Sequence, residues 1–146
     1  MVIRSWPRST RELSSMNSEL RNHFDTELDA VLAALPEAVH QILDQVPLYV
    51  EDYPSLGLMK QLQILHRSHL CGLYTGIPLT EKSVTHSGIL SDAIQIFREG
   101  IIAQTISVAG NLTRDELRNQ IRITILHELG HFHGLSEDDL QALGYG

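Results

Sequence analysis

The first regular pattern of apolar and polar positions lies between residues 18 and 35. Apolar residues recur there every three or four positions, which places them on one face of an α-helix. The acidic side chains between them fall elsewhere on the helix, where we expect water to surround them. The apolar face consists of Leu20, Phe24, Leu28, Val31, Leu32 and Leu35, and the acidic residues are Glu19, Asp25, Glu27 and Asp29.

Pro36 ends this helix and favours the start of a second one. Proline is well accepted in the first turn of a helix because the amide that it lacks would have no partner there. Residues 37–43 therefore predict a short helix. We expect it to direct four apolar side chains inward, namely Ala38, Val39, Ile42 and Leu43.

Short segments with the composition of β-strands follow. Residues 46–51 are rich in β-forming side chains, and residues 93–97 are bounded by polar residues. Residues 70–74 and 77–79 flank the pair Thr75-Gly76, which is typical of a hairpin turn. These segments predict a small sheet.

Two stretches are less regular. Leu58, Leu62 and Leu65 indicate a short helix or an ordered loop. Residues 101–109 are apolar and β-branched, so they fit a strand as well as a helix.

The strongest helical pattern covers residues 113–134. Thr113 and Glu116 have the spacing of a capping box, which satisfies free amides at a helix start. A core stripe follows at four-residue steps, formed by Leu117, Ile121, Ile125 and Leu129. The order of elements predicts an α+β fold, in which a small twisted mixed sheet packs against the first helix and this one.

Length and composition fit one domain. The chain has 146 residues, 42% of them hydrophobic, which is enough for one core and too few for two. We expect this domain to cover residues 18–146 and residues 1–17, rich in Arg and Ser, to form a flexible tail. Such a tail resembles a transit peptide in composition but lacks an amphipathic stripe, and Met16 is an alternative start.

Charge and cysteine content exclude several classes of function. The formal net charge of −7 argues against a nucleic-acid surface, which needs clustered Lys and Arg. No apolar run is long enough to span a membrane. Cys71 is the only cysteine, so the chain forms no internal disulfide, and we expect this residue to act as a small buried apolar group. Together these features predict a cytoplasmic protein that binds neither nucleic acid nor membrane.

The last strong helix carries a metal-binding pattern, Leu-His-Glu-Leu-Gly-His, at residues 126–131. His127 and His131 are one helical turn apart, so both imidazoles can reach a single zinc ion. Glu128 can then accept a proton from water that the metal activates. Gly134 can adopt the left-handed conformation that ends a helix and reverses the chain.

A third protein ligand is expected shortly after the helix. Glu137 follows His131 by six residues, as in metzincins, and Asp138 is its nearest rival. Alternatively, these carboxylates only stabilise the start of a terminal helix that Ser136 caps. His133 is rotated away from the ligand face, so we do not expect it to bind the metal.

The segment from His127 to Glu137 resembles the signature of the small bacterial zincin-like metallopeptidases. Residues 72–79 and 92–98 resemble other parts of the same family, and the resemblance covers most of residues 20–143. It implies a minimal zincin fold, a zinc cofactor, and Glu137 as a ligand at a position where the family commonly has Asp. It also implies a sheet edge beside the metal where a peptide can add as a strand, and residues 93–97 are our candidate for that edge.

The expected function is therefore zinc-dependent hydrolysis of peptide bonds in a peptide or protein substrate, with Glu128 as the general base. Two alternatives remain open: hydrolysis of a non-peptide amide or ester, and a metal-stabilised binding module without turnover. A donor to the tetrahedral oxyanion is also needed. The candidates for this role are His69, Tyr74, Arg98 and Tyr145.

Overall fold

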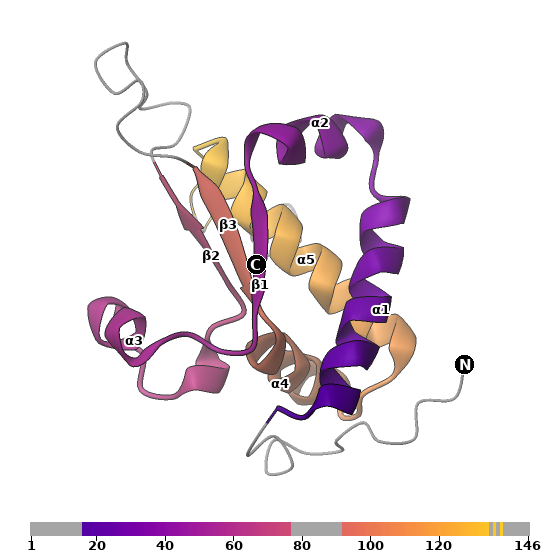
Figure 1. Cartoon of the computed structure of the whole chain (residues 1–146), viewed down its shortest axis with the longest axis vertical. Helices are drawn as coiled ribbons and strands as arrows, with labels where there is room; N and C mark the ends of the chain where they lie inside the picture. Colours follow the sequence, from indigo (N-terminus) through magenta and orange to yellow (C-terminus); the bar gives the residue numbers. More distant parts are fainter. Residues whose placement is uncertain (1–15, 77–91, 135, 137, 139–146) are drawn as a thin grey trace.

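The computed structural model describes residues 16–76, 92–134, 136 and 138. Helices and strands follow one another in the mixed order that the sequence predicts (Figure 1). In chain order the elements are α1 (Ser18–Ala34), α2 (Glu37–Gln45), β1 (Leu48–Glu51), α3 (Leu56–Leu62), the 3-10 helix η2 (Arg67–His69), β2 (Gly72–Thr75), β3 (Ala93–Phe97), α4 (Arg98–Ala109) and α5 (Arg114–Phe132). The predicted α+β class is confirmed.

The three described strands form one mixed sheet in the order β1-β3-β2. β1 runs parallel to β3, with Val50 opposite Ile96, and β2 runs antiparallel to β3, with Gly72 opposite the same Ile96. The prediction that residues 93–97 form a sheet edge is therefore wrong, because β3 is paired on both sides. Its buried side chains Ile94, Ile96 and Phe97 suit a central strand.

Helix α5 covers the sheet, and α1 packs along α5 (Figure 1). The core lies between these layers. Its α5 part is the stripe predicted from the sequence, and its α1 part is the predicted apolar face, in which Leu32 is only partly buried. Burying each such side chain contributes roughly 1.5–3 kcal/mol, so this packing fixes α5 firmly.

The remaining predicted elements are largely confirmed. In α2, Val39, Ile42 and Leu43 pack against the core, whereas Ala38 is exposed. Residues 101–109 are helical, because Ile101, Ile102 and Ile106 share the buried face of α4. The predicted strand at residues 77–79 lies outside the described residues, as does most of the predicted tail.

One acidic residue of α1, Glu27, is not on a solvated face, contrary to the prediction. Glu27 is only 2% exposed, and Arg118 of α5 donates to its Oε2 at 2.6 Å. Asp25 accepts two hydrogen bonds from the guanidinium of Arg98 at 2.9 and 3.2 Å. A buried carboxylate is costly unless it is paired, and Arg118 supplies the pairing for Glu27, whereas the Asp25 side chain is 42% exposed, as predicted.

The same Arg98 also joins β1 to the start of α4. It donates to Asp52, which follows β1 and accepts two further bonds from Arg21 of α1. The hydrogen bond from Arg21 is the main reason why the pKa of Asp52 lies below its usual range. This charge cluster therefore links three elements at the end of the sheet away from α2.

We expect Gly100→Ala to lower the free energy of unfolding by about 2 kcal/mol or more, since overpacking costs about 1–3 kcal/mol. A Cβ at Gly100 would lie 1.9 Å from the carbonyl oxygen of Leu70, and this obstacle is backbone that cannot rotate away. Urea denaturation measures the change. Gly57→Ala is the matched control, because its Cβ would meet only Ser55 Oγ at 4.0 Å. Equal stability of the two variants would contradict the close packing of α4 on Leu70.

Candidate metal centre

Helix α5 carries both histidines, and its local sequence fixes where it starts and which face it buries. The Thr113 hydroxyl accepts a hydrogen bond from the amide of Glu116 at 3.2 Å, as the predicted capping box requires. The buried stripe then holds one side of the helix against the sheet and α1. His127 and His131 lie beside this stripe and are only partly buried. Their imidazoles can therefore be reached from outside the core.

The two imidazoles are brought together by their Nε2 atoms, which are 3.2 Å apart. The ring planes are nearly perpendicular, with centroids 4.8 Å apart. Two nitrogens this close either share one proton in a hydrogen bond or both point at one positively charged group, such as a metal ion. Two ligand nitrogens about 2.0–2.1 Å from one tetrahedral zinc would be about 3.3 Å apart. The observed separation thus fits a zinc ion bound by both rings.

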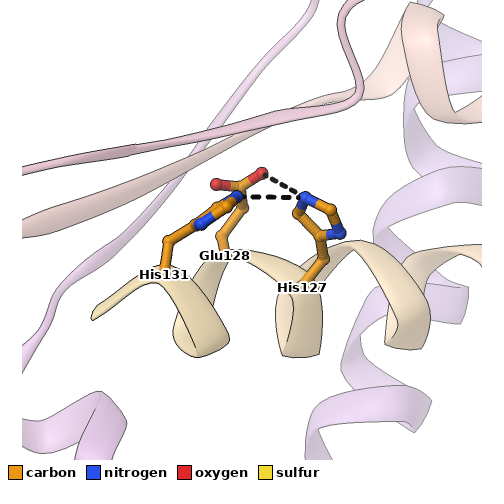
Figure 2. Close-up of side chains that lie close together, drawn as sticks. All are labelled: His127, Glu128 and His131. Atoms are coloured by element: carbon orange, nitrogen blue, oxygen red, sulfur yellow. Dashed lines mark hydrogen bonds and ion pairs between the residues drawn. The ribbon is translucent and has the colours of Figure 1, made fainter. Parts of the chain in front are cut away.

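Glu128 extends from the same side of α5 and directs its carboxylate toward the two rings (Figure 2). Its Oε1 is 4.0 Å from Nε2 of His127, and the residue is only 7% exposed. One possible ligand atom from each of His127, Glu128 and His131 lies within 4.8 Å of the others. Among the described residues, these three form the group that could hold a metal ion.

The predicted end of α5 at Gly134 is confirmed. The helix ends at Phe132, Gly134 has a φ of +83°, and its amide donates to the carbonyl oxygen of His131 at 2.9 Å. Glu137, the predicted third ligand, lies outside the described residues. Asp138 is exposed. His133 is the C-terminal cap of α5. It is exposed and does not belong to the metal-binding group.

Strand β2 lies against α5 beside the candidate centre. Gly72 faces Thr124 and Glu128 so closely that a Cβ there would lie 3.1 Å from Cγ of Glu128. No role at the site was predicted for Gly72. The sequence did contain a signal for such a role, because a glycine inside a strand often marks a close approach of another group.

The candidate oxyanion donors lie in different surroundings. Arg98 donates hydrogen bonds to Asp25 and Asp52. His69 is exposed in η2. Tyr145 lies outside the described residues. Tyr74 belongs to β2, packs edge-on against Phe132 of α5, and donates its hydroxyl to Asp92 at 2.7 Å. Tyr74 is thus the described candidate that packs against the helix of the metal centre.

Cys71 lies next to Gly72, and its thiol donates to the carbonyl oxygen of Gly100 at 3.4 Å. Burial raises the pKa of this thiol to about 12, and the nearby Glu128 carboxylate adds to the effect. A neutral thiol is a poor nucleophile and a poor metal ligand. Cys71 also packs against the core, so it acts as a small apolar group, as predicted.

A separate groove of about 590 Å³ lies between α1, α2 and α5. Its lining is mainly apolar and includes Val31, Leu35, Val39 and Leu126. Leu126 precedes His127 in the chain, but none of His127, Glu128 and His131 lines the groove.

The chain is similar to a known protein family. The family described as zincin-like metallopeptidase matches residues 43–146. The matched range begins in α2 and includes the whole sheet and α5, but not α1. No curated protein matches the chain. Within the described part of the chain, no helix is both long and apolar enough to cross a membrane.

We expect Cys71 to react slowly with thiol reagents. At pH 8 a pKa of about 12 instead of 9.0 lowers the thiolate fraction roughly 10³-fold. Alkylation of the native protein by iodoacetamide should therefore be at least about 100-fold slower than alkylation of the urea-unfolded chain. The sole cysteine makes the signal unambiguous. Similar rates in the two states would show that the thiol is not buried as described.

Proposed function

The chain belongs to the zincin-like metallopeptidases, and from this we propose that it is a zinc-dependent peptidase with Glu128 as its general base. The observation that carries the proposal is the 3.2 Å separation of the two imidazole nitrogens with a buried carboxylate beside them. This donor set suits zinc.

His127 and His131 hold the metal in this proposal, because their Nε2 atoms lie 3.2 Å apart on one side of α5 (Figure 2). When bound, zinc acts as a Lewis acid that polarises a carbonyl group and makes water more acidic. Glu128 accepts the proton of the attacking water and passes it to the leaving amine. Its low exposure keeps bulk water from competing for its carboxylate.

Glu137 completes the ligand set, with Asp138 as the alternative. Gly134 supports this assignment, because its left-handed conformation follows the end of α5 and lies between His131 and Glu137 in the chain. Two histidines and one carboxylate leave a coordination position open, which is typical of catalytic zinc sites.

The substrate is a peptide or protein that binds in extended form along β2. This strand is paired with β3 on one side, and no other described strand pairs with it. It packs on α5, and Gly72 lies against Glu128. A peptide added at this edge would therefore run beside the general base, whereas β1 lies at the other edge of the sheet.

We expect Glu128→Gln to lower kcat at least about 100-fold, because general base catalysis typically contributes 10²–10⁴-fold. The amide keeps the shape of the side chain, so zinc affinity and melting temperature should change little. Cleavage of a peptide library followed by mass spectrometry measures the first effect, and zinc titration measures the second.

Histidine variants supply the controls for this experiment. His127→Ala should lose zinc together with activity, while His133→Ala should keep both, because His133 is exposed and outside the metal-binding group. Undiminished turnover in Glu128→Gln would remove Glu128 from the mechanism. Full zinc occupancy in His127→Ala would move the site elsewhere.

Separate Glu137→Ala and Asp138→Ala variants test the third ligand. Loss of a ligand should weaken zinc affinity at least about tenfold, which is the low end of what even an outer partner contributes. Glu137→Ala should show this loss in a titration against a competing chelator, and Asp138→Ala should not. The reverse order would assign the ligand role to Asp138.

A further inference from the structure

Gly72 of β2 is in contact with α5 at the position of the proposed general base. A Cβ added to Gly72 would lie 2.8 Å from Cγ2 of Thr124, 3.1 Å from Cγ of Glu128 and 3.2 Å from the carbonyl oxygen of Gln95. Real side chains essentially never come closer than 3.0 Å at this atom. Any side chain at residue 72 would therefore have to displace a neighbour.

The strand itself cannot yield easily. On one side, the amide of Phe97 donates to the carbonyl oxygen of Cys71 at 2.8 Å, which ties the start of β2 to β3. On another, the backbone of Leu70 rests directly on Gly100 of α4. The obstacle at Gln95 is also backbone. A displacement caused by a new Cβ would thus fall on the side chains of α5.

Of the two α5 side chains in contact, Glu128 is the one that can move. The Thr124 hydroxyl donates to the carbonyl oxygen of Gln120 at 2.8 Å, and the residue is buried, which fixes its rotamer. Glu128 has three side-chain torsions, and rotation about them can shift its Cγ. Moving its Cγ would move the carboxylate beside His127.

We infer that Gly72 is a positioning residue for Glu128. The missing side chain at residue 72 creates the space in which Cγ of Glu128 lies, and the strand backbone then limits where the carboxylate can point. This inference rests on the proposed role of Glu128 as general base. A misplacement of about 1 Å in a catalytic group can cost about 10²-fold in rate, so even a small shift is measurable.

A simple structural role must be separated from positioning. Gly72→Ala alone would also press on Thr124, which could lower stability. The double variant Gly72→Ala/Thr124→Ser removes that contact, because serine lacks Cγ2 but keeps the hydroxyl that donates to Gln120. What remains is the contact of the new methyl group with Glu128 at 3.1 Å and with the backbone carbonyl oxygen of Gln95 at 3.2 Å, and of these two only the Glu128 side chain can rotate away. The double variant therefore carries the test.

We expect the zinc-loaded double variant to keep zinc affinity within about 3-fold of the unsubstituted protein, since neither histidine is touched. Its kcat on the best-cleaved library peptide should fall about 10- to 100-fold, with KM changed less than about 3-fold. In a Glu128→Gln background, the same two substitutions should change the residual rate less than about 2-fold, because the carboxylate that they displace is gone. Gly57→Ala should retain full activity.

A second measurement does not depend on turnover. In the unsubstituted protein, NMR should show a nuclear Overhauser effect between the α-protons of Gly72 and the γ-protons of Glu128, and the double variant should show a different Glu128 γ-proton shift. If the unsubstituted protein cleaves no peptide, the proposed function fails, and these spectra still decide whether Gly72 sets the position of Glu128.

Several results would overturn the inference. They are an absent Overhauser effect, an unchanged kcat in the double variant, a change confined to KM, and an equal loss in the Glu128→Gln background. A double variant that does not fold would also overturn it, because the contact at Glu128 would then determine the fold rather than the carboxylate position.

Discussion

The close packing of α5 on the sheet is the constraint on which the rest of the structure depends. The apolar stripe of this helix and the apolar face of α1 form much of the core, and the metal-binding group lies beside that stripe. Any rotation of α5 that moved the histidines would expose Ile121 or Ile125. The energy of apolar burial therefore also sets the direction of His127 and His131.

Charges buried at the contacts between elements restrict the fold further. Glu27 joins α1 to α5 through Arg118, and Glu99 of α4 accepts a hydrogen bond at 2.8 Å from Arg67, which lies over the ring of Tyr53. Removal of one partner would leave a buried charge, which typically costs about 3–5 kcal/mol. Such pairs add little net stability but disfavour other arrangements of the helices.

Local patterns predicted most elements well, and long-range contacts account for the errors. The bounds of α1, β3 and α5 follow from periodicity and capping. Glu27 was predicted to be solvated because its partner, Arg118, is 91 residues away in the sequence. Strand β3 was placed at an edge because strand order depends on pairings that no local pattern encodes. The spacing of His127, Glu128 and His131 predicted their proximity, whereas the contact between Gly72 and Glu128 joins two elements and could not be read from either.

The position of α1 has a consequence for the part of the chain that matches the family. The matched range begins after α1, yet Phe24, Leu28 and Val31 shield the apolar stripe of α5 from water. The segment that carries the metal-binding residues is therefore not self-sufficient, because its main helix would present an uncovered apolar surface without a cover from elsewhere in the chain. The matched range of this chain therefore depends on α1, which lies outside it, to keep the apolar side of α5 out of water.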